Sequence, residues 1–211
     1  MEVPKIINVR VLDLRFPTSL HQIGADAVNR DPDYSAAYCV LETDPGIEGH
    51  GLTFTLGRGT ELCVSAIRYL SRFVRGRNLS SLTDDLVAFS RQRTGDTQFR
   101  WLGPEKGVVY LAVAALINSV WDLYARVEEK PRWKLLADFE PEQIVGAIDF
   151  ACITDAISPD EALALLKERG TGKVTRLQQL KQHGYANACN TWRSLTSFPS
   201  PDRWNAVRWN L

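Results

Sequence analysis

The chain has 211 residues, of which 45% are hydrophobic and 24% charged, enough to fill a sizeable core. Its 25 basic and 25 acidic residues give a formal net charge of zero, which argues against a nucleic-acid binder or a protein that docks on anionic membranes. The first residues show neither a secretory signal nor a clear Arg/Ser-rich transit peptide, and no uninterrupted apolar run approaches the roughly 18 residues of a membrane span. We therefore expect a soluble, cytoplasmic protein.

The four cysteines, at positions 39, 63, 152 and 189, lack the spacing of a metal site. Their even number permits disulfides, but isolated cysteines in hydrophobic stretches are more typical of buried thiols in a reducing compartment. We favour buried thiols.

Three short segments have the alternation of β-strands. "IINVRVLDLRF" (6–16) ends before Pro17, "SAAYCVLETD" (35–44) leads into a Pro-Gly turn, and "GHGLTFTLG" (49–57) follows that turn. Short connections between them predict an antiparallel meander. The loop between the first two strands, "GADAVNRDPDYSAAY" (24–38), concentrates acidic and amide side chains, which in a loop are usually turn formers.

Helical patterns follow. A segment at 60–76 has Thr60 as a candidate N-cap and predicts one apolar face, composed of Leu62, Ala66, Leu70 and Phe73. A second helix is expected over 81–94, with Leu82, Leu86 and Phe89 inside. The segment 106–128 is apolar on most sides and predicts the buried central helix.

The later segments are shorter or more polar. Pro131 opens a short helix, and "EQIVGAIDF" (142–150) predicts one more strand. Ser158 and Glu161 have the spacing of a capping box for the helix at 158–170, and a polar, basic helix is expected over 171–185. The remaining tail has three tryptophans without a period, and Pro199 and Pro201 break any helix there, so we expect it to be poorly ordered.

No segment has the pattern of a self-contained catalytic site. There is no nucleophile, zinc, dinucleotide or phosphate-loop motif among the three histidines, four cysteines and fourteen glycines. His50 is interpreted as a hairpin-turn residue and His183 as a helix-end residue. Gly57 and Gly59 favour a plain strand-to-helix turn over an anion site. Asn118 and Asp122, four apart on the central helix, favour partners in neighbouring backbone or arginine groups over catalysis.

Several long stretches together resemble one known family. They are "DLRFPTS", "GADAVNRDPDYSAAYCVLETD", "GHGLTFTLGRGTE", "RWLGPEKGVVYLAVAALINSVWDLYAR", "KPRWKLLADFEPEQIV" and "IDFACITDAISPDEAL", and with them the resemblance runs almost continuously from about residue 6 to Tyr185. The chain resembles the N-terminal region of the enolase superfamily, in its mandelate racemase/muconate lactonizing branch. It is most similar to the L-fuconate dehydratases, including the mitochondrial members found in animals.

The resemblance implies an α+β fold: an enolase-like N-terminal capping domain, in which a three-stranded antiparallel meander precedes a helical bundle. Complete members add a (β/α)8 barrel that holds one Mg2+, a Lys-x-Lys base and a His–Asp pair, and they dehydrate sugar acids. No Lys-x-Lys occurs in this sequence, and about 26 residues after Tyr185 are too few for a barrel. The simplest expectation is a truncated product without the barrel, for which we expect no catalytic residue, no bound metal and no activity alone.

The implied division is a capping domain over 1–140, the start of a connection into the barrel over 141–185, and a divergent tail over 186–211. By motif match, the substrate-side residues are Gly24, Ala25 and Asp26, with Tyr34 just beyond. Amides and hydroxyls there can hydrogen-bond a sugar acid.

Three further positions are assigned less directly by the resemblance. Gly57 and Arg58 are a second candidate contact to the substrate. Trp101 is interpreted as core packing rather than as a residue at the barrel mouth.

The alternative to a capping domain is a non-catalytic interaction module or splice variant that pairs with itself or with a complete relative. The surface that would normally face the barrel is then an apolar patch open to association, as in a homo-oligomer. Nucleic acid and membrane are not expected as partners, and the resemblance adds a mitochondrial location as an alternative to the cytoplasm.

Overall fold

The computed structural model describes residues 3–94, 97–98, 100–103 and 106–183. The chain divides into two compact units, Met1–Pro159 and Asp160–Leu211, and each is considered by itself. The predicted tail from residue 186, with Cys189, lies outside the described residues. The predicted division at residues 140 and 185 stays a prediction.

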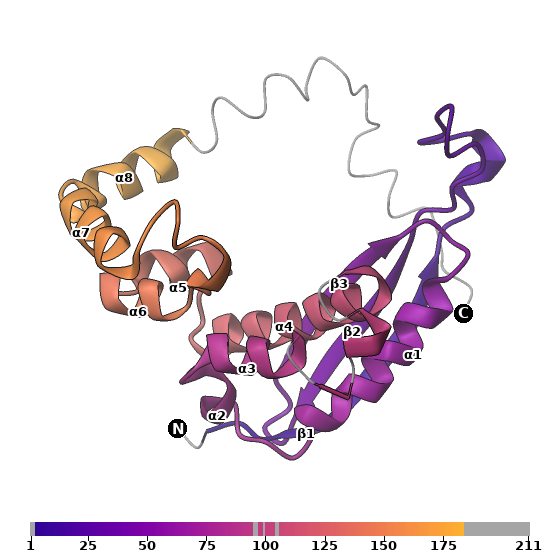
Figure 1. Ribbon diagram of the computed structural model, residues 1–211, viewed down its shortest axis with the longest axis horizontal. Helices are drawn as coiled ribbons and strands as arrows, with labels where there is room; N and C mark the ends of the chain where they lie inside the picture. Colours follow the sequence, from indigo (N-terminus) through magenta and orange to yellow (C-terminus); the bar gives the residue numbers. More distant parts are fainter. Residues whose placement is uncertain (1–2, 95–96, 99, 104–105, 184–211) are drawn as a thin grey trace. The chain divides into compact units, whose positions relative to one another are not determined.

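The first unit is built on a three-stranded antiparallel sheet (Figure 1). Its strands are β1 (Ile6–Arg15), β2 (Ser35–Thr43) and β3 (Glu48–Thr55), in the order β1-β2-β3. The register places Cys39 between Val11 on one side and Gly51 on the other, and the side chains of Val11 and Cys39 belong to the hydrophobic core. The meander predicted from period-two alternation is confirmed.

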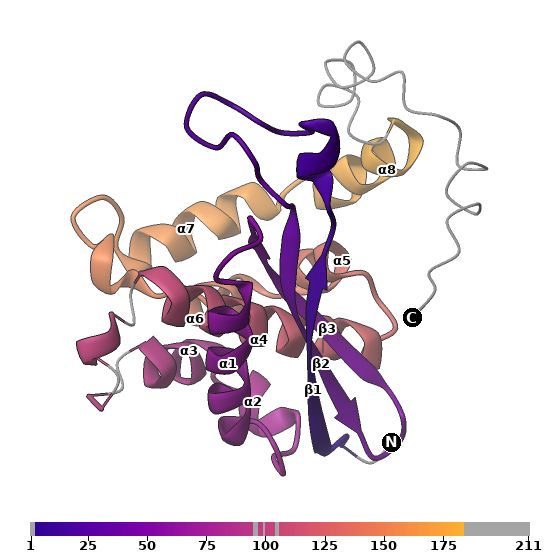
Figure 2. The same cartoon turned by 90° about the vertical axis from the view of Figure 1, so that its right-hand side faces the viewer.

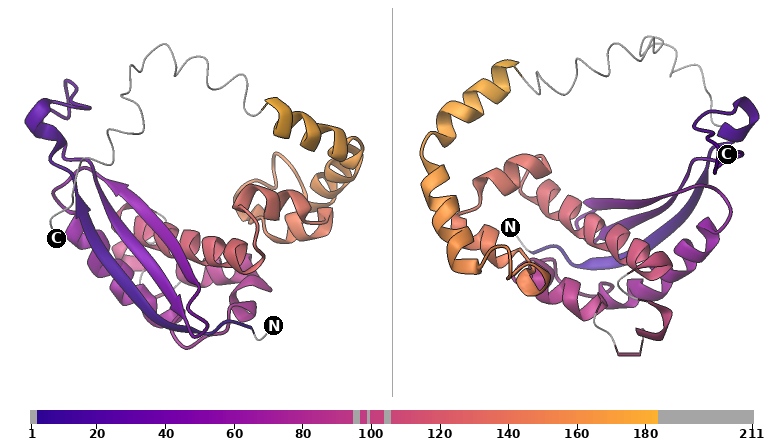
Figure 3. Two further views of the ribbon diagram at one scale, coloured as in Figure 1. Left: turned by 180° about the vertical axis from the view of Figure 1, so that it is seen from behind. Right: turned by 45° about the horizontal axis from the view of Figure 1, so that its top comes forward.

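Two helices cover that face of the sheet: α1 (Thr60–Leu70) and α4 (Gly107–Val127) lie behind the strands in the left view of Figure 3. The helix α4 lies directly against β3 because that strand carries two glycines. A Cβ placed on Gly51 would lie 2.1 Å from the carbonyl oxygen of Ala115, and one on Gly49 would lie 2.5 Å from that of Ser119. The expected buried central helix is therefore confirmed. It can pack this closely on β3 because glycine has no side chain.

By length and composition alone, α4 is apolar enough to cross a bilayer, which the search for uninterrupted apolar runs did not indicate. Half of its most apolar window is buried inside the unit, as in the core helix of a folded domain. Residues that share the core with it come from the sheet and α1, including Leu41, Ile67 and Leu70.

The helix α1 differs from its prediction in three details. It ends at Leu70, whereas the predicted helical segment ran to residue 76. Thr60 is its first residue rather than its N-cap, which is Gly59, and the Thr60 hydroxyl donates to the carbonyl of Gly57. The buried face consists of Cys63, Val64, Ile67 and Leu70, whereas Leu62 is 58% exposed. The predicted stripe was wrong at Leu62 because the sequence offers apolar residues on both sides of the helix, and only packing on the sheet selects one.

The expected helix over 81–94 is two helices, α2 (Ser80–Thr83) and α3 (Leu86–Thr94), after the short 3-10 turn η2 (Ser71–Phe73). The break lies at Asp84 and Asp85. The Asp85 carboxylate accepts from the backbone N–H of Ala88, so it caps a new helix start in place of continuing the old one. The predicted inward positions Leu82, Leu86 and Phe89 are buried.

The strand predicted over 142–150 is wrong: this segment begins with α6 (Pro141–Gly146), after α5 (Arg132–Asp138). Glu140 and Gln143 form a capping box, and Pro141 occupies the first helical position, which it prefers. Local start signals thus outweigh the apolar run at Ile144. The short turns η3 (Arg100–Leu102) and η4 (Phe150–Cys152) complete the unit.

Asn118 and Asp122 of α4 have the kinds of structural partner that were predicted, a neighbouring arginine or backbone group. The Arg132 guanidinium donates to the side-chain and backbone oxygens of Asn118, at 3.1 and 2.7 Å. Asp122 accepts from the backbone N–H of His50 at 2.8 Å and from Arg126 at 2.7 Å. His50 itself lies within β3, so its interpretation as a turn residue was wrong.

The side chains of Cys39 and Cys63 are buried free thiols, as predicted. Trp101, which we expected in the core, is 81% exposed. The indole lies in the short turn η3, outside the helices that build the core, so its hydrophobicity gave the wrong position.

In the second unit the structure describes two helices, α7 (Pro159–Gly170) and α8 (Lys173–His183). Both confirm predicted helices. Ser158 immediately precedes α7, at the position of the predicted cap, and His183 ends α8 as expected.

Candidate functional site

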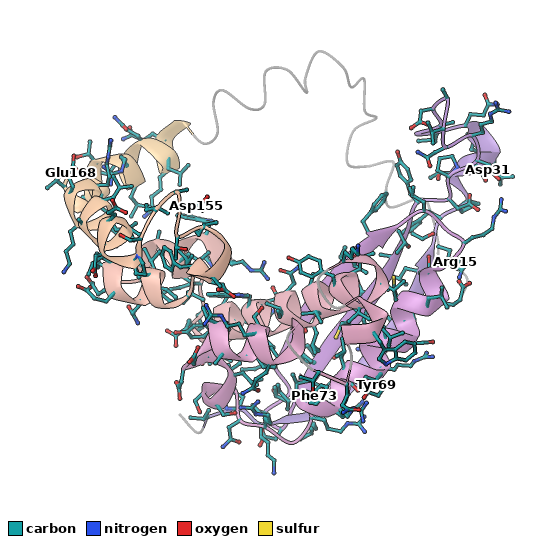
Figure 4. The ribbon with its side chains drawn as sticks, in the orientation of Figure 1. Arg15, Asp31, Tyr69, Phe73, Asp155 and Glu168 are labelled. Atoms are coloured by element: carbon teal, nitrogen blue, oxygen red, sulfur yellow. The ribbon has the colours of Figure 1, made fainter. Side chains whose placement is uncertain are left out.

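The polar loop singled out in the sequence lies beyond the ends of the strands, where β1 leaves the sheet and β2 enters it (Figure 2). The connection from β1 to β2, of which this loop is part, also contains the short 3-10 turn η1 (Thr18–His21), and the turn between β3 and α1 lies beside it. We call residues 16–34 and 56–59 together the loop cluster. Figure 4 shows Arg15 at the end of the sheet and Asp31 farther out in the loop.

Gly24 and Tyr34, two of the predicted site residues, are in contact. Gly24 has a φ of +75°, and a Cβ there would lie 1.8 Å from the Tyr34 hydroxyl, so only glycine leaves room for the phenol. The Tyr34 ring also packs edge-on against Phe54, with centroids 5.2 Å apart. The tyrosine is therefore fixed between the strand and the loop, with its hydroxyl at the loop backbone.

Asp26, another predicted site residue, folds its own turn. Its Oδ1 accepts from the backbone N–H groups of Val28 and Asn29 at 2.7 and 2.6 Å, and these bonds hold the pKa of the carboxyl below its usual range. Among the described residues, its Oδ2 accepts only from the Asn29 amide, at 3.3 Å. A carboxylate oxygen accepts more than one bond, so Asp26 retains capacity for a ligand hydroxyl. Ala25 lies beside it and is exposed.

The base of the loop is tied by side chains that sequence reasoning did not select. The Thr18 hydroxyl donates to the Pro32 carbonyl at 2.8 Å and accepts from the backbone N–H of Tyr34 at 2.9 Å. Asp33 accepts from the Ser19 hydroxyl at 2.6 Å and from the Ser19 N–H at 3.2 Å, and these bonds lower the pKa of its carboxyl. Local turn chemistry gave no signal for contacts fourteen residues apart.

The second candidate contact, Gly57 and Arg58, lies against the first loop. The backbone N–H of Asp33 donates to the Leu56 carbonyl at 3.3 Å. A Cβ on Gly57 would lie 3.1 Å from that of Asp33, and Arg58 pairs with Asp31 at 2.8 Å. The structure thus places both predicted contact regions in one cluster.

The loop cluster exposes apolar side chains in addition to its polar groups. The large hydrophobic residues exposed there are Phe16, Leu20, Ile23, Val28 and Leu56, and Val28 is 88% exposed. Exposed apolar side chains gathered in one loop cluster make it a candidate for contact with another surface or a ligand.

Within the described residues, no group of three or more His, Cys, Asp or Glu side chains could hold a metal ion. The carboxylates of the loop cluster are each engaged: Asp26 with backbone N–H groups, Asp31 with Arg58, and Asp33 with Ser19. This part of the chain does not fit the Mg2+ that complete enolase-superfamily members use.

A shallow hollow of about 620 Å3 lies at the other end of β3, between the β2–β3 turn and the end of α4. Its cations are already paired, Arg126 with Asp122 and Lys130 with Asp138. It is wide open and does not share residues with the loop cluster, so we do not assign the candidate site to it.

The chain is similar to proteins of known family over most of its length. No protein-family model matches it. It is 53% identical over 183 residues to mitochondrial enolase superfamily member 1 of Xenopus laevis, and 48% identical over 186 residues to the L-galactonate dehydratase of Hypocrea jecorina. These matches cover 86% and 88% of this chain but 41% of each relative. The chain therefore spans less than half the length of these relatives.

Solved structures agree with this relationship. The crystal structure of human mitochondrial enolase superfamily member 1 matches 84% of this chain with a TM-score of 0.81 and 51% identity, again over 41% of that protein. A Bradyrhizobium enolase complexed with magnesium and mandelic acid matches with a TM-score of 0.51 at 24% identity, which shows a shared fold. The meander and the helices after it are thus the N-terminal capping fold of these proteins, and the described residues contain no barrel.

Proposed function

Since this chain belongs to the enolase superfamily, we propose that its loop cluster is the substrate-capping part of an acid-sugar dehydratase. We propose six-carbon sugar acids as substrates: L-galactonate is suggested by the name of one relative, and L-fuconate by the sequence resemblance. The reaction is the loss of water to form a 2-keto-3-deoxy acid.

The observation that carries the proposal is the arrangement of Gly24, Asp26 and Tyr34 in an exposed loop that a rigid sheet supports. A cap needs hydrogen-bonding groups at defined positions and apolar side chains that exclude water. The phenol at Gly24 and the remaining acceptor capacity of Asp26 supply the first. The uncovered residues Leu20 and Val28 supply the second.

The chemical step itself is assigned to residues beyond this part of the fold. In complete relatives, a bound Mg2+ would stabilise negative charge on the substrate. The described residues of this chain do not form a metal-binding site of that kind. For this chain we therefore propose binding, orientation and exclusion of water, and no proton transfer.

A chimera tests the cap directly. Residues 1–183 of this chain would replace the matching part of the Hypocrea jecorina L-galactonate dehydratase, and turnover of L-galactonate and L-fuconate with Mg2+ would be followed by product identification. We expect activity on at least one acid, and Tyr34→Phe should raise KM more than it lowers kcat. Tyr110→Phe, the same chemical change on α4 outside the loop cluster, is the matched control and should have a smaller effect. A folded chimera that turns over neither acid contradicts the proposal.

The purified chain alone should form no 2-keto-3-deoxy acid above a buffer blank. Turnover by the chain alone would contradict our assignment of the chemistry to other residues.

The exposed apolar side chains of the loop cluster also favour association, with a second copy or with a complete relative. Light scattering after gel filtration measures this, and a monomer at micromolar concentration contradicts it. The names of the animal relatives favour a mitochondrial location, which fractionation of cells expressing the chain would test.

A further inference from the structure

Three separate stretches of the chain meet at one residue, Asp33. Its carboxylate accepts two bonds from Ser19 in the first stretch, and its own N–H donates to the Leu56 carbonyl in the third. The absence of a side chain at Gly57, with a φ of +103°, lets the turn lie directly on Asp33.

Charge supports the same contact. Asp33 lies in the field of Arg15 from β1 and Arg58 from the turn, and both attract its negative charge. Hydrogen bonds to an ionised acceptor are roughly twice as strong as those between neutral groups. The bonds from Ser19 to Asp33 are therefore stronger than hydrogen bonds between neutral groups would be at this point.

The rest of the loop is tied differently. Residues 20–31 are all exposed. They are folded by the Asp26 turn and the contact of Gly24 with Tyr34, and the exposed ion pair of Asp31 with Arg58 connects them to the turn at 56–58. Tyr34 directly follows Asp33, and its backbone N–H is held by Thr18. The position of the phenol over Gly24 thus depends on the base of the loop, where Asp33 is the link.

From this geometry we infer that Asp33 is a positioning residue that joins the loop at 18–34 and the turn at 56–58 into one body, so that the two segments move together over a substrate. The structural part of this inference stands by itself, and its role in binding a sugar acid rests on the proposed function. Asp33 acts through Tyr34 and Arg58 rather than by contact with reacting atoms.

Amide hydrogen exchange of this chain, read by mass spectrometry or NMR, tests the link. Asp33→Ala should speed exchange at Ser19, at Tyr34 and at Thr60 beyond the turn by about tenfold or more, because a charge-assisted hydrogen bond is lost. Amides at 37–41, in the middle of β2, should be unchanged. Asp31→Ala is the matched control. It removes the ion pair with Arg58, which also joins the loop to the turn but is exposed at both ends, so it should leave these rates within about twofold.

Asp33→Asn should restore most of the protection, because its amide oxygen can still accept from Ser19. If Asp33→Ala unfolds the unit, Ser19→Ala replaces it, since that change removes only the hydroxyl donor. Faster exchange at Ser19 without any change at Thr60 would overturn the inference, because the two segments would then move independently. Equal effects of the Asp33→Ala and Asp31→Ala substitutions would also overturn it.

The chimera described above gives the functional readout. There, Asp33→Ala should raise KM for the sugar acid about tenfold with a smaller change in kcat, and Asp33→Asn should recover most of it. A KM unchanged by Asp33→Ala overturns the role in binding. If the chimera is inactive before any substitution, the proposed function fails, while the exchange rates of the chain still decide whether Asp33 links the segments.

Discussion

Because α4 packs closely on β3, we expect a substitution of Gly51 to destabilise the fold strongly. A Cβ at this position would lie 2.1 Å from the Ala115 carbonyl oxygen and 2.5 Å from the Ser119 nitrogen. Even a close carbon–oxygen contact is about 3.3 Å, so α4 would have to move by roughly 1 Å. Both neighbours are backbone atoms of a 21-residue helix, and no rotamer change can relieve the contact.

Inserting atoms into a packed core costs about 1 to 3 kcal/mol when side chains can adjust. Because here only a whole helix can adjust, we expect Gly51→Ala to lower the free energy of unfolding by about 3 kcal/mol or more. With a urea slope of about 1 to 3 kcal/mol/M, the midpoint should fall by about 1 M or more. The Tm should fall by about 6 to 12 °C for a chain of this size.

Far-UV circular dichroism during urea and thermal unfolding measures both quantities. Gly146→Ala is the matched control, because it makes the same chemical change at a helical glycine with nothing within 4 Å of the new Cβ. It should leave stability unchanged or raise it by up to about 1 kcal/mol. A Gly51→Ala midpoint within about 0.2 M of the wild type would refute the packing of α4 against β3.

Three further outcomes are expected. Burial raises the pKa of the Cys39 thiol to about 11 and also raises the pKa of Cys63, so about a thousandth of Cys39 is thiolate at pH 8. Iodoacetamide labelling of the native chain, mapped by mass spectrometry, should therefore leave both cysteines unmodified until urea unfolds the chain. Glu129 has a φ of +52° just beyond α4, in the left-handed region that favours glycine. Glu129→Gly should therefore raise the free energy of unfolding by up to about 1 kcal/mol, seen as a higher urea midpoint, and a lower midpoint contradicts this. The bonds from Ser19 lower the pKa of the Asp33 carboxyl in the folded state. The Ser19–Asp33 bonds are therefore complete above the unfolded pKa of about 4 and are lost as pH falls through the folded pKa. The NMR shift of the Ser19 amide should be constant from pH 7 to about 4 and change only below pH 4, and a midpoint above pH 4 contradicts this.

Where the sequence failed to predict structure, the deciding contacts were either local signals that were passed over or distant ones that leave no local pattern. The capping box at Glu140 and Gln143 was visible in the sequence and outweighs the apolar run that suggested a strand. The Ser19–Asp33 bond, by contrast, joins residues fourteen apart across an irregular loop. The exposed indole of Trp101 shows the same limit, because hydrophobicity gives a preference for burial and not a position.

The sequence by itself determined the meander, the central helix and the family. Period-two alternation, turn residues and a long apolar helix are local features, and extended motifs are specific in any context. Only the tertiary structure showed that Gly24 contacts Tyr34, that Asp26 Oδ1 accepts hydrogen bonds within its own turn, and that Asp33 contacts two loops. The physical reason is that these contacts depend on where three strand ends meet, a position that the whole sheet and its helices fix together.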